Sequence, residues 1–302
     1  MRILIFLALT TLFIACKGKQ NEAEKAIETQ TALYNSNPTD STAQALIKAI
    51  TDYLTARGHD DSTTSKYVIQ AAEVSAERNQ LNQALGFYKM YLIEYPNQPD
   101  VDDRLVNVIE ILEKLQKKDL LQILYRSFSD RFKDDSRASE YAALVERKEV
   151  TIDSLLKEYG LRMFNDSIYR LDENIARLYV DASEAAVMSQ PDLPNAPEYL
   201  HRAAETARTL RDIPKAITLY DWVIERYPQH PRGSTSLFLK AFTYDNDLKD
   251  YDSARIYYEE FLRKYPDNEF AESAKFLLEN LGKSDEELRQ IIEEKQKDQP
   301  VK

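Results

Sequence analysis

The chain has 302 residues, a net charge of −11 and 30% charged residues of both signs. It contains no basic block of the kind that contacts phosphates, so nucleic acid is excluded as an expected partner. Its single cysteine excludes an intramolecular disulfide, so the fold must be stabilised by its core alone.

Residues 1–15 have the plan of a secretory signal peptide. Arg2 supplies one positive charge, and the next fourteen residues, ILIFLALTTLFIAC, carry no charge. This run is too short to span a bilayer as a helix, which takes about 20 apolar residues. It ends in Phe13-Ile14-Ala15-Cys16, which resembles the lipobox of bacterial lipoproteins.

The lipobox resemblance implies that Cys16 carries a diacylglycerol and becomes the first residue of the mature protein. Cys16 is then a membrane anchor rather than a nucleophile, and residues 16–24 are the anchor and a polar tether. The alternative is a chance cysteine in an ordinary signal peptide. Lys17 is not the Asp that retains lipoproteins in the inner membrane of many bacteria, so we expect the outer membrane. The non-acidic KGK favours its periplasmic face.

From residue 25 almost to the end, apolar residues recur at helical spacing, which predicts an all-α fold. The sequence has six glycines and no clear alternation of β-branched residues, so we expect no sheet. The expected parts, in chain order, are an N-terminal helical array at 25–132, an irregular connection with a degenerate repeat at 133–194, a C-terminal array at 195–283, and a capping helix with a polar tail at 284–302.

A sequence motif recurs in the expected helices. Residues 84–96, 216–228 and 254–266 all read A-x3-Y-x2-Φ-x3-Y-P, where Φ is apolar. Spacings of 4, 3 and 4 place four side chains on one helical stripe, and the proline then ends the helix. A weaker copy lies at 121–133. We place a degenerate copy on Ile175, Tyr179, Ala182 and Ala186.

Each motif helix follows a helix that also carries small residues, so two antiparallel helices can approach closely while aromatic side chains fill the wider gap. The repeat residues are Ala72, Ala84, Tyr88 and Pro96 in the first copy, Ala204, Ala216, Tyr220 and Pro228 in the second, and Ala254, Tyr258 and Pro266 in the third. The third copy needs a one-residue insertion between Tyr244 and Tyr251.

This pattern resembles the tetratricopeptide repeat (TPR), a helix pair of 34 residues that stacks into a superhelix. The recurrent Tyr-Pro is similar to that of envelope TPR lipoproteins and periplasmic proteins of the BamD and CpoB kinds. The resemblance implies an all-α, right-handed TPR-type superhelix. It also implies a scaffold that binds envelope proteins, in outer-membrane assembly or envelope organisation.

The resemblance also implies a partner-binding groove. TPR grooves are lined by set positions of the first helix of each pair. In the repeat that ends at Pro228, these positions fall on Glu198, His201, Glu205, Arg208 and Thr209. The alternative is that these residues form an ordinary solvated helix face.

No catalytic, metal or cofactor site is expected. His59, His201 and His230 are scattered, so a metal site of the usual histidine or cysteine type lacks ligands. No phosphate-binding or nucleophile motif occurs. Acidic pairs such as Glu259-Glu260 are typical of solvated helix faces.

A second function remains open at this point: a surface glycan- or nutrient-binding lipoprotein. Nutrient-uptake lipoproteins of the SusD kind also contain TPR helices and a lipobox, but they are usually longer and carry exposed aromatic residues. Here Trp222 is the only tryptophan. We expect it to be half exposed or packed against an adjoining turn.

Overall fold

A computed structural model describes residues 22–57, 62–165, 170–284, 286–290 and 293. The expected signal peptide, Cys16 and most of the tether lie outside the described residues, as does most of the polar tail. The chain divides into two compact units, residues 1–146 and 147–302. The division falls inside the segment 133–194, which the sequence pattern leaves irregular.

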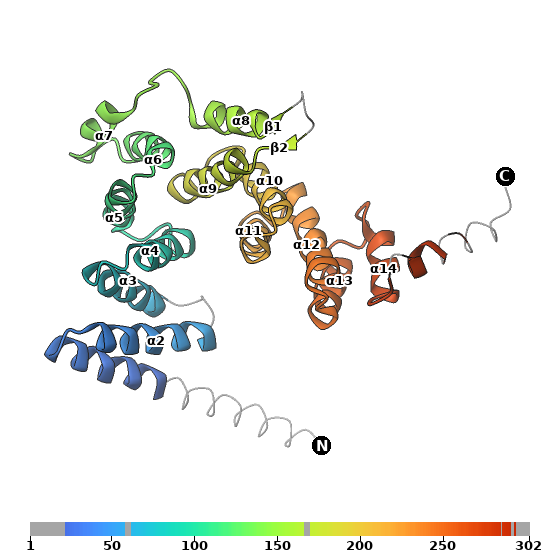
Figure 1. Ribbon diagram of the computed structural model, residues 1–302, viewed down its shortest axis with the longest axis horizontal. Helices are drawn as coiled ribbons and strands as arrows, with labels where there is room; N and C mark the ends of the chain where they lie inside the picture. The colour runs from blue at the N-terminus through green and yellow to red at the C-terminus, as the bar shows by residue number, and fades with distance from the viewer. Residues whose placement is uncertain (1–21, 58–61, 166–169, 285, 291–292, 294–302) are drawn as a thin grey trace. The chain divides into compact units, whose positions relative to one another are not determined.

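Unit 1 consists of consecutive helices (Figure 1). They are a helix at 22–36, α2 (Asp40–Arg57), α3 (Ser62–Glu77), α4 (Leu81–Glu94), α5 (Val101–Lys114), α6 (Lys118–Arg131) and α7 (Ala138–Leu144). Unit 2 contains α8 (Ile152–Arg162), β1 (Phe164–Asn165), β2 (Arg170–Leu171), α9 (Glu173–Ser189), α10 (Ala196–Thr209), α11 (Ile213–Arg226), α12 (Pro231–Thr243), the π-helix η1 (Tyr244–Leu248), α13 (Tyr251–Lys264) and α14 (Ala271–Glu279).

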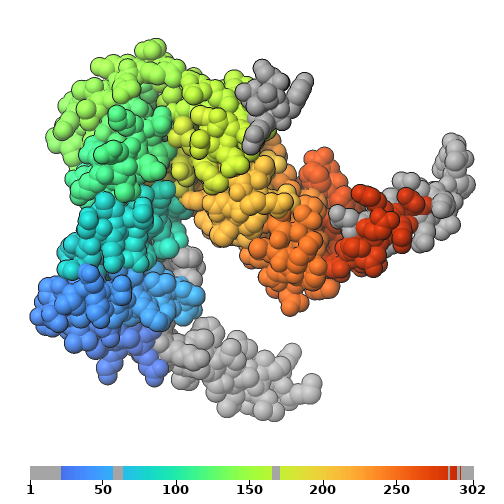
Figure 2. Space-filling view, in the orientation of Figure 1, coloured from blue at the N-terminus to red at the C-terminus, as the bar shows by residue number. Residues whose placement is uncertain are grey.

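The helices pack mainly on their neighbours in the chain. Among the described residues, the most extensive contacts join α-helices that follow one another in the chain, and α10 also packs on α12. Figure 2 shows the same order as successive colours within each unit. The expected all-α solenoid of helix pairs is confirmed. One small difference is the two-residue hairpin, in which Phe164 of β1 lies opposite Leu171 of β2.

The repeat residues on the expected stripes are buried. Ala72, Ala84, Ala204, Ala216 and Ala254 are each 0% exposed. The stripe tyrosines Tyr88, Tyr220 and Tyr258 are at most 3% exposed. Small residues therefore stand where two helices approach, and aromatic rings fill the adjoining space.

Four helix pairs share one turn geometry. Asn79, Gln116, Arg211 and Lys249 each lie between the two helices of a pair with φ between 55° and 63°. In three of these turns the next residue donates its N–H to the carbonyl five residues back, as in a Schellman motif. These bonds are Gln80 to Ser75, Lys117 to Leu112 and Asp212 to Ala207. The α5–α6 pair, whose sequence motif is weak, is therefore a full member of the array.

The fourth turn contains the expected insertion. Asp250 donates its N–H to the carbonyl of Tyr244, six residues back, so this turn holds one residue more than the others. The extra residue is accommodated in η1, which continues α12 with π-helical hydrogen bonds. The insertion that the sequence predicts between Tyr244 and Tyr251 thus takes the form of a π-helix.

The degenerate repeat in α9 has a different register from the expected one. Gln190 donates its N–H to Ala186, and Leu193 donates to Gln190, the same pattern that Tyr227 and His230 form after α11. Gln190-Pro191 therefore corresponds to Tyr227-Pro228. The stripe runs through Tyr179, Ser183 and Ala186, one helical turn later than we expected, because Gln replaces the Tyr that marks the turn elsewhere.

Candidate functional site

The five residues predicted for the groove all lie on α10, but they do not share one face. At 3.6 residues per turn, Glu198, Glu205 and Thr209 lie along one line of the helix. His201 and Arg208 lie on the flank that faces α12. The structure therefore splits the predicted set into the exposed Glu205 and Thr209 and three residues that contact the next repeat, Glu198, His201 and Arg208.

The prediction that His201 lines an open groove is wrong. Its side chain is 1% exposed, and its Nδ1 lies 2.9 Å from the Ser236 hydroxyl of α12. Burial lowers the pKa of His201 to about 4, so the ring is neutral at neutral pH. The residue joins α10 to α12 because α12 packs directly on this flank.

Glu198 is partly exposed, but its carboxylate forms an ion pair with a residue of the next repeat. Its carboxylate accepts a hydrogen bond from Arg232, at the start of α12, at 2.8 Å. Asp103 and Arg137 form the corresponding pair in unit 1, at 2.7 Å. In both units, an arginine at the start of the first helix of one repeat thus contacts an acidic residue at the start of the first helix of the preceding repeat. This ion pair joins the two repeats.

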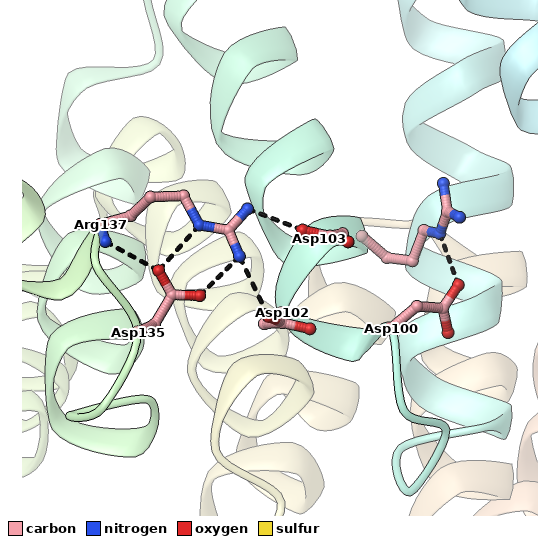
Figure 3. A network of polar contacts seen from close by, with 6 residues as sticks. Asp100, Asp102, Asp103, Asp135 and Arg137 are labelled. Atoms are coloured by element: carbon pink, nitrogen blue, oxygen red, sulfur yellow. Dashed lines mark hydrogen bonds and ion pairs between the residues drawn. The ribbon is translucent and has the colours of Figure 1, made fainter.

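Figure 3 shows the fuller form of this joint in unit 1. The Arg137 guanidinium contacts three carboxylates, Asp135 at 2.6 Å, Asp103 at 2.7 Å and Asp102 at 3.0 Å. The hydrogen bonds from Arg137 lower the pKa of Asp135 to about 2. Because these carboxylates share one guanidinium, the cluster has the character of an internal joint rather than a cation site.

Arg208 is held by a residue that the sequence did not indicate. Its Nε lies 2.5 Å from Asp247 Oδ2, in η1, and its guanidinium lies over the Phe242 ring at 4.9 Å. Arg211 Nη1 contacts the other oxygen of Asp247 at 3.1 Å. The Asp247 side chain is 4% exposed, so a nearly buried carboxylate fixes two arginines, Arg208 near the end of α10 and Arg211 in the α10–α11 turn.

These groups enclose a hollow at the end of α10, which we call the η1 pocket. It is lined by Arg208, Thr209, Arg211, Asn246 and Asp247. Only Arg208 and Thr209 belong to the predicted groove. Arg211 lies in the turn rather than on the first helix, and Asn246 and Asp247 depend on the π-helix.

The exposed row on α10 consists of Glu205 and Thr209, with Glu198 at its start. The Glu205 side chain is about half exposed, at 51%, and its Oε2 lies 3.4 Å from the buried His201 ring. Partial burial raises the pKa of Glu205, against the nearby arginines that lower it. Thr209 is exposed and donates its hydroxyl to the Glu205 carbonyl. The row therefore presents the polar side chains of Glu205 and Thr209 to solvent beside the buried His201 ring.

The other features of the described chain that could indicate a ligand, metal or membrane site give little support for one. Trp222 is 7% exposed, so of the two alternatives the structure favours packing over half exposure, and its ring belongs to the core. No group of three or more His, Cys, Asp or Glu residues within the described ranges could hold a metal ion. None of the helices that the structure describes is long and apolar enough to cross a membrane.

Residues 235–268 match the sequence profile of the family described as Tetratricopeptide repeat. The match spans the length of one repeat. It covers most of α12, all of η1 and α13, and therefore includes the inserted residue. The match indicates a protein-interaction scaffold. No curated protein matches the chain.

Several solved structures are similar to the chain at low identity. The TPR2AB domain of yeast Sti1 in a pHSP90 complex is 15% identical and has a TM-score of 0.29, over 85% of this chain and 97% of that chain. BtubC (BKLC) from P. vanneervenii is 12% identical with a TM-score of 0.28, over 95% of each chain. An assembly chaperone of RpL4, Acl4, is 12% identical with a TM-score of 0.29, over 91% and 98%.

Proposed function

We propose that this protein is a lipid-anchored TPR scaffold of the bacterial cell envelope that binds a protein partner through the exposed row of α10. The observation that carries the proposal is the contrast between this row and what lies beside it. Glu205 and Thr209 face solvent, whereas His201 and Trp222 are buried. A rigid helix that presents polar groups can orient a partner chain without rearranging its own core.

The envelope location rests on the sequence around Cys16. A charge-free run that ends in FIAC supports lipidation, and Lys17 supports the outer membrane with the periplasmic face. A scaffold held there would act in outer-membrane assembly or in envelope organisation. The proposed role is binding, with no catalytic step and no cofactor.

The burial of aromatic side chains supports a protein partner over a glycan. Glycan binding uses exposed aromatic faces, but Trp222, Tyr220 and Tyr258 are in the core. Of the residues that the structure describes, the large exposed apolar ones are mainly single leucines and an isoleucine, with Phe164 and Tyr251 the aromatic members. The two aromatic members lie on separate elements, β1 and α13, and form no stacking platform.

Membrane recovery tests the scaffold proposal. Affinity-tagged wild type and a Glu205→Lys/Thr209→Arg variant would be purified from membranes, and the co-purifying proteins quantified. We expect the variant to lose a partner that wild type retains, with an unchanged melting temperature, since both side chains are exposed.

The matched control is Glu259→Lys/Thr218→Arg on α13 and α11. Both residues are exposed, and the Thr218 hydroxyl bonds back to a helical carbonyl as Thr209 does. The control should retain the partner. Unchanged recovery with the α10 variant, together with lost recovery on deletion of 195–283, would move the contact to another surface.

Lipidation has its own test. Metabolic labelling with a clickable fatty acid should mark wild type and leave Cys16→Ser unmarked. Equal labelling of the two proteins would remove the anchor from the proposal while leaving the scaffold role open to the recovery experiment.

A further inference from the structure

We infer that the η1 pocket is a subsite for an oxyanion carried by the bound polypeptide, either the carboxylate of an acidic side chain or the phosphate of a phosphorylated one. The inference rests on the proposed function, because the pocket adjoins the exposed row through Thr209. It adds the chemical character of the partner, which the scaffold role alone leaves open.

The pocket carries an excess of positive charge. Arg208 and Arg211 each contribute one positive charge, and Asp247 contributes one negative charge. Both carboxylate oxygens of Asp247 are engaged, since Oδ2 contacts Arg208 and Oδ1 contacts Arg211. The five residues that line the pocket thus carry a net charge of +1, although the whole chain has a net charge of −11.

The pocket also retains unused donors. A guanidinium has five N–H donors. Among the described residues, Arg208 and Arg211 each use one nitrogen, toward Asp247. The amide of Asn246 is exposed and has no hydrogen-bond partner in the part of the chain that the structure describes. An incoming oxyanion would therefore meet two cationic forks and a neutral amide donor.

These donors are held in place before a ligand arrives. Asp247 fixes both guanidiniums. The Arg208 guanidinium also lies over the Phe242 ring, at 4.9 Å. Groups ordered in advance lose less conformational freedom on binding. The arrangement depends on the inserted residue, because η1 brings Asp247 against the α10–α11 turn.

Two other hollows lack this charge excess. One, between the helix at 22–36 and α3, is lined by one acid and one base, Glu28 and Lys66, among other residues. The other, at α9–α11, has two acids and two bases: Arg177, Asp181, Asp212 and Lys215. Of these three hollows, the η1 pocket alone is suited to an anion.

Fluorescence anisotropy with the full chain in detergent tests the inference. Three dye-labelled ten-residue peptides would differ only at alternate positions, which hold Glu, phosphoserine or Gln. We expect the Glu and phosphoserine peptides to bind at least tenfold more tightly than the Gln peptide. The stronger of the two charged peptides identifies the source of the oxyanion.

Arg211→Ala should weaken the charged peptides at least fivefold and leave the Gln peptide unchanged. Its matched control is Arg255→Ala, an exposed arginine of α13 with the same charge change. Deletion of Asn246, which shortens η1 by one residue but keeps both arginines, should also abolish the preference for charge. Because Arg211 is 80% exposed, its variant is expected to fold.

Equal effects of Arg211→Ala and Arg255→Ala, or equal binding of the Gln and charged peptides, would overturn the subsite. The absence of binding by all three peptides would overturn it too. These outcomes are distinct from failure of the scaffold, which membrane recovery with the α10 variant measures independently.

Discussion

The Tyr265 hydroxyl donates a hydrogen bond to the carbonyl oxygen of Pro228, 3.1 Å away. The pair joins the Tyr-Pro turn after α13 to the Tyr-Pro turn one repeat earlier. Tyr227 makes the same bond to Pro191 at 3.0 Å, and in unit 1 Arg131 reaches Pro96 at 2.9 Å. In these two copies, the tyrosine of the Tyr-Pro pair thus links successive repeats.

Removing these links should weaken the stacking of repeats. We expect Tyr227→Phe and Tyr265→Phe each to lower the free energy of unfolding by about 0.5–1.5 kcal/mol, the usual net value of one hydrogen bond. Denaturant unfolding monitored by circular dichroism measures it. Tyr251→Phe, at an exposed tyrosine of α13, is the control and should be neutral. Equal stabilities of all variants would show that the links contribute nothing.

The small stripe residues should not tolerate enlargement. Ala216→Leu and Ala254→Leu add methyl groups at positions that are 0% exposed, so each should cost about 1–3 kcal/mol through overpacking. Ala45→Leu at an exposed position of α2 should have little effect. Unchanged thermal midpoints for the two stripe variants would contradict close helix approach at these alanines.

Two variants of Tyr220 separate the contribution of its ring to stability from that of its hydroxyl. The ring is 0% exposed, and the hydroxyl is buried with no hydrogen-bond partner among the described residues. Tyr220→Phe should therefore preserve or raise stability, because it removes an unsatisfied buried polar group. Tyr220→Ala should cost about 3–5 kcal/mol by leaving a cavity. A clear loss of stability in Tyr220→Phe would mean that the hydroxyl is bonded, for example to a buried water.

His201 should make stability fall with acid. Its folded pKa is lowered to about 4, whereas an unfolded histidine titrates near 6.5. As the pH falls from about 6.5 to about 4, the unfolded chain binds a proton that the folded chain does not, so the folded state loses stability. The difference amounts to about 1.4 kcal/mol per unit of pKa difference.

The comparison of wild type with His201→Asn isolates this effect, because other groups titrate equally in both. The destabilisation of wild type relative to the variant should grow from pH 7 to pH 4. His230→Asn, at a histidine for which only partial burial is observed, serves as the control. Parallel stability–pH curves for wild type and His201→Asn would show that the ring is accessible in its charged form.

The helix pairs were predictable because the residue spacing that defines them lies within single helices. Spacings of 4, 3 and 4 define a stripe, and Ala216, Tyr220 and Val223 lie on it as expected, each 0% exposed. The start of the helix expected at 284–302 is local as well, because Ser284 and Glu287 form a capping box. Ser284 accepts from the Glu287 N–H at 3.3 Å, and Glu287 accepts from the Ser284 N–H at 2.7 Å.

The turns and the pocket were not predictable, for physical reasons. A position with a left-handed backbone conformation is usually recognised in a sequence by its glycine. Here such positions hold Asn79, Gln116, Arg211 and Lys249. The spacing of α10 placed His201 near the groove, yet it could not show that α12 covers that flank. The insertion was visible, but its π-helical form determines which residue points inward, and that residue is Asp247.

Site-specific photo-crosslinking in cells tests whether the exposed row of α10 contacts the partner protein. A photoreactive amino acid would replace Glu205 or Thr209 on the exposed row of α10, and Glu259 on α13 as the control. If this row binds the partner, positions 205 and 209 should each give a covalent adduct of the same partner protein, and position 259 should give none. An adduct from position 259 alone, or the same adducts from all three positions, would contradict it.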